Sequence, residues 1–332
     1  MGLFDGLKSK RKAASTIAEQ KDIHEDENLN KDEESSIESE QPEIEEPETN
    51  KNVPVIEDQY EARPIKSMSE KKRVTHTVGE TKIIAIINQK GGVGKSTTAV
   101  NLSAALGERN KQVLLVDLDP QGNATSGLGI DKGQLEYEVY DVLLQDADVM
   151  NCIVPDVVEG VDVLPSTIDL AGAEVELVPL MARENRLRNA IGALRGRYDY
   201  IFIDCPPSLG LLTVNALVAA DKLLIPIQCE FYALEGVTKL LESMKRVKSM
   251  LNPSLDIFGV VLTMFDSRTT LSKQVAEEVE NFFGKAVFKT RIPRTVKLSE
   301  APSYGQPITI YDPSCKGALS YIELAEEAIE RG

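Results

Sequence analysis

The chain has 332 residues and a formal net charge of −16, with 53 acidic against 37 basic side chains. Its two histidines, His24 and His76, both precede residue 81, so the remainder has no imidazole for a Ser/His nucleophile or a histidine metal site. The four cysteines are scattered and form no C-x-x-C pair, which argues against a disulfide framework or a metal cluster and predicts free thiols.

The first 80 residues differ in composition from the rest. They contain 12 basic against 20 acidic side chains, and between Glu19 and Glu61 the count is 3 against 17. A segment with so much charge and so few large apolar residues cannot bury enough surface to offset chain entropy. We therefore expect a disordered acidic extension over residues 1–80, followed by one globular domain over residues 81–332.

The start of the extension, residues 1–12, is a separate feature. Leu3, Phe4 and Leu7 share one helical face and are followed by four basic side chains before residue 13. This pattern is typical of a weak interfacial membrane anchor, but such short segments bind membranes marginally. A frayed terminus or a short docking peptide is the favoured interpretation. No apolar run approaches the roughly 18 residues of a membrane span.

Strand and helix patterns alternate through residues 81–332. Short runs rich in β-branched residues predict strands at 82–88, 112–119, 161–165, 200–207, 222–228 and 257–265. Periodic patterns predict helices at 96–110, 173–196, 231–251 and 271–284. This alternation is typical of an α/β fold with a doubly wound, mainly parallel sheet flanked by helices. Ligands of such sheets collect at the carboxyl ends of the strands.

The loop after the first strand reads NQKGGVGKSTT. Gly94, Lys95 and Ser96 fit the end of the phosphate-loop pattern G-x-x-x-x-G-K-[ST], although Gln89 stands where its first glycine belongs. Amides from Gly92 to Lys95 would cradle a β-phosphate, Lys95 would neutralise β and γ oxygens, and the Ser96 hydroxyl would bind Mg²⁺. A flexible glycine turn with an incidental lysine is disfavoured, because the loop joins a strand to a helix.

Acidic residues end two of the predicted strands. Asp204 closes YIFID and is placed to hold the hydration shell of Mg²⁺. Asp117 and Asp119 alternate along another strand, so that one is expected to face the metal and the other to orient or deprotonate water. Each alone has the alternative interpretation of a helix cap.

Five blocks of the sequence carry a resemblance to a known family. KGGVGKST resembles the deviant Walker A motif of the ParA/MinD ATPases, and four further blocks resemble its ParA/Soj chromosome-partitioning branch: VDLDPQGNATSGLG, FIDCPPSLGLLTVNAL, IQCEFYALEGVTKLL and RIPRTVKLSEAPSYGQPITIYDP. Together they span nearly all of residues 81–332. The resemblance implies a P-loop NTPase fold and a slow, Mg²⁺-dependent ATPase. It also implies an ATP-bound homodimer on non-specific DNA, and a ParB-like partner at centromere-like sites that stimulates hydrolysis. The protein would then be cytoplasmic and associated with the nucleoid.

The resemblance also assigns roles to single residues. Lys90 would be the signature lysine that reaches the phosphates of the partner's nucleotide, Lys95 would serve its own subunit, and Asp119 would position the attacking water. These three would be the catalytic residues. Nucleotide contacts would come from Lys90, Gly91, Gly92, Val93, Gly94, Lys95, Ser96 and Thr97, with Pro293 and Thr295 beside the adenine. Mg²⁺ would be held by Ser96 and, through water, by Asp204, with Asp117 as a further candidate.

Basic residues near the end of the chain are the candidates for DNA binding. Arg268 and Lys297 match positions that contact DNA non-specifically in Soj-type proteins, and Arg294 lies close to them in sequence. Phosphate contacts of this kind depend on salt rather than on sequence. The alternative interpretation is ordinary solvated surface charge.

Other functions remain open at the level of sequence. A MinD-like ATPase that acts at a membrane would need an anchor, yet the chain ends in acidic YIELAEEAIERG. An ATPase that positions a polar organelle on a scaffold would differ from a chromosome-partitioning ATPase only in its partner. An iron–sulfur carrier would need clustered thiolates, which the four scattered cysteines do not supply.

Overall fold

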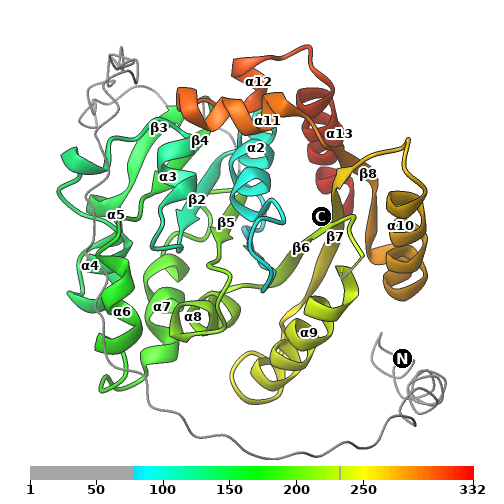
Figure 1. The fold of residues 1–332 in the computed structure, drawn as a ribbon. Coiled ribbons are helices and arrows are strands. Elements are labelled where there is room, and N and C mark those ends of the chain that lie inside the picture. The colour runs from blue at the N-terminus through cyan, green and yellow to red at the C-terminus, as the bar shows by residue number, and fades with distance from the viewer. Residues whose placement is uncertain (1–77, 232) are drawn as a thin grey trace, which may run out of the picture. The chain divides into compact units, whose positions relative to one another are not determined.

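A computed structural model describes residues 78–231 and 233–332 of the protein (Figure 1). The predicted acidic extension, apart from residues 78–80, lies outside the described residues, and so do the basic start at residues 1–12 and both histidines. The described residues cover the range predicted to be globular, 81–332, except for residue 232.

An eight-stranded sheet forms the centre of the described fold (Figure 1). Its strands lie in the order β3-β4-β2-β5-β1-β6-β7-β8, and all neighbours are parallel except β3 and β4. The bounds are β1 Lys82–Ile86, β2 Val113–Asp117, β3 Val154–Val158, β4 Val161–Leu164, β5 Tyr200–Asp204, β6 Lys222–Gln228, β7 Asp256–Phe265 and β8 Val287–Pro293.

Helices cover both faces of this sheet, because successive side chains of a strand point to opposite sides. On β1, Ile83 and Ala85 belong to one apolar cluster, and Ile84 and Ile86 belong to the other. The first face is covered by α4 Val139–Leu144, α5 Val149–Cys152, α6 Leu170–Glu176, α7 Arg186–Gly192, α8 Leu211–Ala219, α9 Ala233–Met250 and α10 Thr270–Phe283. The second face is covered by α2 Lys95–Gly107, α3 Asn123–Gly127, α11 Val296–Glu300, α12 Ile308–Tyr311 and α13 Lys316–Arg331.

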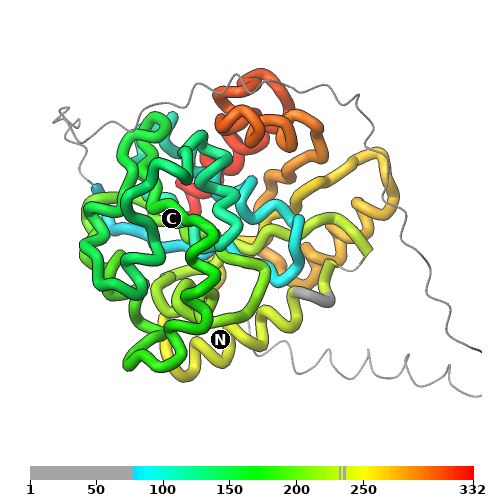
Figure 2. Tube along the Cα trace, turned by 60° about the vertical axis from the view of Figure 1, so that its left-hand side comes forward, coloured from blue at the N-terminus to red at the C-terminus, as the bar shows by residue number. Residues whose placement is uncertain are grey.

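Strand β1 lies where the direction of winding changes. It pairs with β5 on one side and with β6 on the other, and Ile86 is level with Asp204. The turned view shows the cyan segments running from the left edge toward the middle of the fold, with green elements mainly on the left and orange and yellow elements mainly on the right (Figure 2). A crevice at the carboxyl end of such a strand is the usual ligand site of a doubly wound sheet.

The predicted architecture is confirmed, since the sheet is doubly wound, mainly parallel and flanked by helices. All six predicted strands form. The continuous helix predicted over 173–196 is wrong, because the chain breaks between α6 and α7 around Pro179 and around Ala182, whose φ is 52°. The elements that were not predicted are the edge strands β3 and β8 and the helices α3, α4, α5, α8, α11, α12 and α13. Among the described residues no helix has the length and apolarity that spanning a bilayer requires.

Candidate active site

The glycine loop between β1 and α2 is held in shape by contacts from both ends. Asn88 accepts a hydrogen bond from the Lys90 amide at 3.0 Å and donates one to the Pro226 carbonyl at 2.8 Å. The Thr263 hydroxyl on β7 donates to the Val93 carbonyl at 2.8 Å. The loop is therefore positioned by the neighbouring strands and not only by its own sequence.

Two glycines give the loop its path. Gly92 has a φ of 74° and Gly94 a φ of 90°, values in the left-handed region that side chains disfavour. Gly94 is also the N-cap of α2, and no side chain there accepts a hydrogen bond from the first amides of the helix. The open amides and the helix dipole together favour an anion at this position. Helix α2 begins at Lys95, one residue earlier than the sequence indicated.

Lys95 brings a buried positive charge to the loop. Its exposed fraction is 7%, and its Nζ donates to the Lys90 carbonyl at 3.4 Å. Burial lowers the pKa of Lys95, while the nearby carboxylates of Asp204 and Asp119 oppose that shift. The lysine is thus poised beside the loop amides, where it adds positive charge to a site that already favours anions.

Asp204 is the acidic counterpart of Lys95. It ends β5 level with Ile86 and Asp117, is fully buried, and neither carboxylate oxygen accepts a hydrogen bond of ordinary length from the described residues. Burial, and next the charge of Asp117, raises the pKa of Asp204, although the Ser96 hydroxyl and Lys95 lie near enough to lower it.

A buried carboxylate without a full partner fits a cation. Among the described residues no cluster of three His, Cys, Asp or Glu side chains is arranged as a metal site. Mg²⁺ commonly uses one or two protein groups together with water and phosphate oxygens. Ser96 and Asp204 fit that kind of site.

Asp117 and Asp119 differ in what they contact. Asp117 Oδ2 accepts hydrogen bonds from the Thr125 amide and hydroxyl, both at 2.8 Å, and its Oδ1 accepts one from the Asp119 amide at 3.2 Å. Burial raises the pKa of Asp117 to about 6. The Asp119 carboxylate accepts one hydrogen bond from the described residues, from the Gln121 amide at 3.0 Å, and Asp119 lines a cavity over the glycine loop. The contacts favour Asp119 as the residue that faces water, and a metal role for Asp117 stays a prediction.

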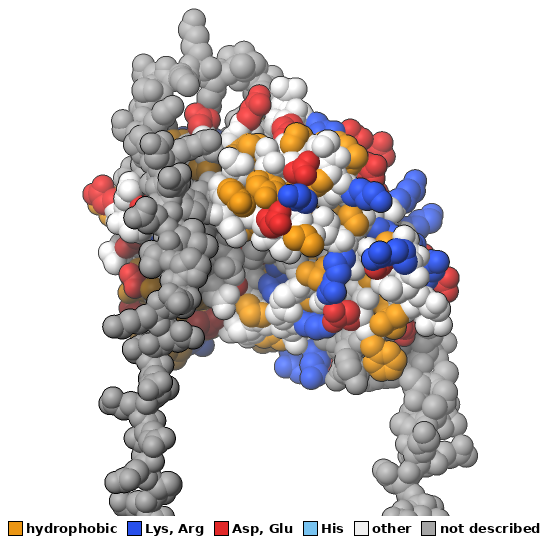
Figure 3. Space-filling model, turned by 45° about the horizontal axis from the view of Figure 1, so that its top comes forward, with side chains coloured by type: hydrophobic (Ala, Val, Ile, Leu, Met, Phe, Trp, Pro, Cys, Tyr) orange, Lys and Arg blue, Asp and Glu red, His pale blue; other side chains and the backbone are white. Residues whose placement is uncertain are grey.

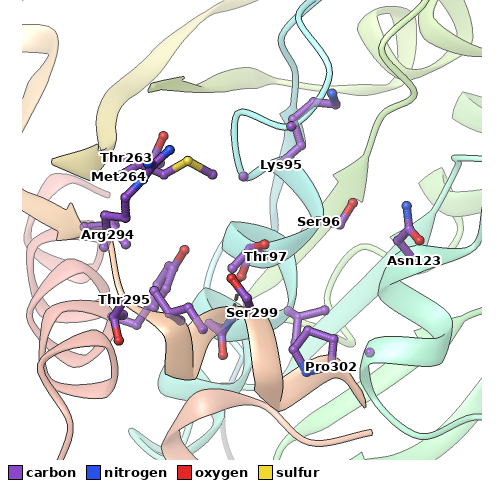
Figure 4. A pocket seen from close by; sticks show the side chains of 18 of the residues that line it. Lys95, Ser96, Thr97, Asn123, Thr263, Met264, Arg294, Thr295, Ser299 and Pro302 are labelled. Atoms are coloured by element: carbon purple, nitrogen blue, oxygen red, sulfur yellow. Dashed lines mark hydrogen bonds between the residues drawn. The ribbon is translucent and has the colours of Figure 1, made fainter. Parts of the chain in front are cut away.

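This cavity has a volume of about 930 Å³ (Figure 4). The cavity is lined on one side by Gly91, Gly92, Gly94, Lys95, Ser96 and Thr97, and on another by residues 292–296 and Leu298. The predicted pair Pro293 and Thr295 lies on this second wall, together with Met264 and Pro302. A phosphate-binding end and a more apolar wall suit a nucleotide, although adenine contact with this wall stays a prediction.

Lys90 lies outside the cavity wall. Its Nζ forms an ion pair with Glu230 Oε2 at 3.0 Å, and the Lys90 side chain is 40% exposed. The two lysines of the loop therefore differ in position. One is buried beside the cavity, and the other is half exposed at the rim.

The candidate DNA-binding residues lie at the ends of β7 and β8 and on α11, and each is already paired. Arg268 is 87% exposed and donates to both carboxylate oxygens of Asp266, whose pKa these bonds lower to about 2. Lys297 pairs with Glu300 at 3.0 Å, and Arg294 lies 3.8 Å from Glu230. Lys and Arg side chains gather on the side of the molecule that carries α10 and β8 (Figure 3).

Several residues of the site were not predicted from the sequence. Thr263 comes from a strand 170 residues away from the loop, and nothing local marks it. Asn88 and Glu230 lie inside or beside the sequence motifs, but their partners become visible only in the fold. Long-range partners of this kind leave no periodic or spacing signal.

Comparisons with known proteins agree with this geometry. The family described as AAA domain matches residues 81–257. The sporulation initiation inhibitor protein Soj of Bacillus subtilis is 59% identical over 251 residues, which is 76% of this chain and 99% of that protein. The chromosome partitioning protein ParA of Caulobacter vibrioides is 51% identical over 75% of this chain and 94% of that protein.

A solved structure gives the same fold with ligands present. Cobyrinic acid a,c-diamide synthase from Mycobacterium smegmatis, with bound ADP and magnesium, is 41% identical and has a TM-score of 0.67. The similarity covers 75% of this chain and 94% of that chain.

The unsatisfied carboxylate yields a stability prediction. Asp204→Asn should raise the unfolding free energy of the ligand-free protein by about 1–3 kcal/mol, because the cost of burying the charge and its repulsion from Asp117 outweigh its attraction to Lys95. The same variant should lose most of the stabilisation that ADP with magnesium gives the parent. Urea denaturation with and without these ligands measures both effects.

Asp117→Asn is the matched control. It alters a neighbouring buried carboxylate whose oxygens accept three hydrogen bonds, so this variant should be destabilised. If Asp204→Asn is also destabilised without ligand, the carboxylate is a structural group and not a cation site.

Proposed function

Because this chain belongs to the family of ParA and Soj chromosome-partitioning ATPases, we propose that ATP binding switches it into a dimer that binds DNA. The observation that carries the proposal is the different placement of the two loop lysines. Lys95 is buried at the cavity, whereas Lys90 is at the rim with its side chain half exposed. A lysine so placed suits the phosphates of a nucleotide held by a second subunit.

The cavity supplies the groups that phosphoryl transfer needs. Loop amides and Lys95 would hold the β- and γ-phosphates, and Ser96 and Asp204 would hold the metal. Bound Mg²⁺ would neutralise charge on the phosphates as the bond to the γ-phosphate breaks. Asp119, whose carboxylate accepts one hydrogen bond within the described part of the chain, would orient the attacking water. It is a weak base, and the domain has no histidine, so intrinsic turnover should be slow.

An exposed apolar stripe supports association of two copies. Ile168, Val175 and Val178 recur at near-helical spacing along and beside α6, and they are 70%, 73% and 53% exposed. The stripe adjoins the segment after β5, since Glu174 on α6 accepts hydrogen bonds from the amides that begin α8. Pro207 of that segment lines the cavity. An apolar surface beside a nucleotide cavity suits a dimer that closes over ATP.

The cations beyond β7 and β8 would then contact DNA. A dimer presents Arg268, Arg294 and Lys297 twice, and DNA phosphates would replace their present carboxylate partners. Such contacts are independent of sequence and weaken as salt rises. A ParB-like partner at centromere-like sites would stimulate hydrolysis, return the protein to monomers, and so drive segregation of a chromosome or plasmid at the nucleoid.

The remaining parts of the chain fit this proposal as accessory regions. Residues 81–332 would be the switch domain, and residues 1–80 an acidic extension that limits non-specific attraction to DNA through its charge. Contact of residues 1–12 with a membrane or with a cell pole would add a second binding location without changing the ATP-dependent switch.

The two lysines should fail in different ways when replaced. Lys95→Ala should lower ATP affinity at least about tenfold, because a buried charge on the bound phosphates is lost. Lys90→Ala should keep ATP binding within about threefold but lose ATP-dependent dimers and hydrolysis. Calorimetric titration and sedimentation velocity separate the effects, and equal behaviour of both variants would contradict the two-lysine mechanism.

Asp119→Ala should trap the ATP-bound state. The variant should dimerise with ATP, but its turnover should fall at least about a hundredfold, since orientation of water is lost. Phosphate release under single-turnover conditions is the measurement. Turnover equal to that of the parent would remove Asp119 from the mechanism.

The double variant Arg268→Glu with Lys297→Glu tests the DNA surface. It should dimerise normally with ATP, while its affinity for random-sequence duplex falls at least about a hundredfold, because phosphate contacts become repulsive. Fluorescence anisotropy at two salt concentrations measures it. DNA binding as tight as that of the parent would place the surface elsewhere.

A further inference from the structure

Glu230 occupies the junction between β6 and α9. It follows the end of the strand by two residues, and its amide donates to the Gln228 carbonyl at 2.8 Å. Its own carbonyl accepts a hydrogen bond from the Ala233 amide at 2.9 Å. The backbone is thus fixed on both sides, while the side chain is 45% exposed at the rim of the cavity.

One carboxylate here serves three groups. Oε2 lies 3.0 Å from Lys90 Nζ, and Oε1 lies 3.8 Å from an Arg294 nitrogen. Oε1 also accepts a hydrogen bond from the side-chain amide, Nε2, of Gln228. Arg294 also lines the cavity. Glu230 therefore joins the glycine loop to the cavity wall formed after β8.

The backbone of Lys90 is held by hydrogen bonds, whereas its ammonium group is free to exchange one ion-pair partner for another. Asn88 binds its amide at 3.0 Å, and Lys95 donates to its carbonyl at 3.4 Å. Its ammonium is half exposed on a flexible stem, so it can leave Glu230 without any movement of the loop. In the dimer without DNA, Glu230 would keep Arg294 and Gln228 as partners, which limits the cost of that departure.

We propose that Glu230 is a positioning residue that competes with the partner's nucleotide for Lys90 and so sets how readily the dimer forms. This inference rests on the proposed function. In the monomer the carboxylate holds the lysine. In the dimer the phosphates of the other subunit replace the carboxylate, and a triphosphate does so better than a diphosphate because it carries more negative charge.

The exposure of the Lys90–Glu230 ion pair limits how much it can change the dimerisation constant. A half-exposed ion pair changes an equilibrium by up to about fivefold, and a two-fold dimer breaks two of them. Glu230→Gln keeps the shape of the side chain and removes its charge. Its dimer should therefore be roughly two- to twenty-five-fold tighter than that of the parent.

Sedimentation velocity with a non-hydrolysable ATP analogue and magnesium tests this on the full chain. Glu280→Gln is the matched control, because Glu280 forms a similarly exposed ion pair with Arg291, at 2.6 Å, and should leave the dimer constant unchanged. Lys90→Gln should by itself form no analogue-dependent dimer, and Glu230→Gln should not restore one in that background. A dimer gained from Glu230→Gln in the absence of Lys90 would show that Glu230 does not act through the lysine.

The outcomes separate this inference from the function on which it rests. If the parent dimerises with the analogue and Glu230→Gln dimerises equally or less well, the competition is absent and the inference fails alone. If the parent stays monomeric with the analogue, the proposed switch fails as well. The melting temperature of each variant, compared with that of the parent, verifies that the fold is intact.

Discussion

The turn from β1 into α2 is the constraint on which the rest of the site depends. Gly92 and Gly94 must adopt left-handed φ values of 74° and 90°, and only then do the first amides of α2 face the cavity. Thr263 and Asn88 hold this turn from neighbouring strands. The parallel sheet is thus more than a scaffold. It places the glycine loop, a helix terminus and the ends of β5 and β6 at one edge, and a nucleotide can be bound there.

Around that turn the protein keeps charges that cost stability in the absence of ligand. Lys95 is almost fully buried, and Asp204 is buried without a full hydrogen-bond partner, beside a second buried carboxylate at Asp117. Burial of charge is unfavourable unless a partner compensates for it. Phosphates and a hydrated cation would supply those partners, so ligand binding is coupled to relief of the electrostatic cost. The same coupling makes the occupied state distinct from the empty one, as a switch requires.

The sequence predicted the sheet because buried parallel strands consist of apolar, β-branched runs, and it predicted the loop because glycine and lysine spacing is fixed by phosphate geometry. Prediction from the sequence was wrong where contacts between distant parts of the fold override the local pattern. The apolar residues of 173–196 recur at helical spacing, yet the helix is interrupted at Pro179. Val175 and Val178 fit that spacing as well, but they are exposed, and spacing alone does not distinguish an exposed apolar face from a buried one. The partner of Lys90 comes from the segment after β6, and that of Val93 comes from β7. Contacts between segments so far apart in the sequence leave no signal in residue spacing.

The central claim is that the γ-phosphate controls association through a lysine at the rim of the cavity. The contrast between buried Lys95 and half-exposed Lys90 supports it, as does the apolar stripe beside the cavity. The most direct measurement is the molar mass of the purified full chain by light scattering, with magnesium and either ATP or ADP. We expect a dimer with ATP and a monomer with ADP. The same mass with both nucleotides would contradict the claim.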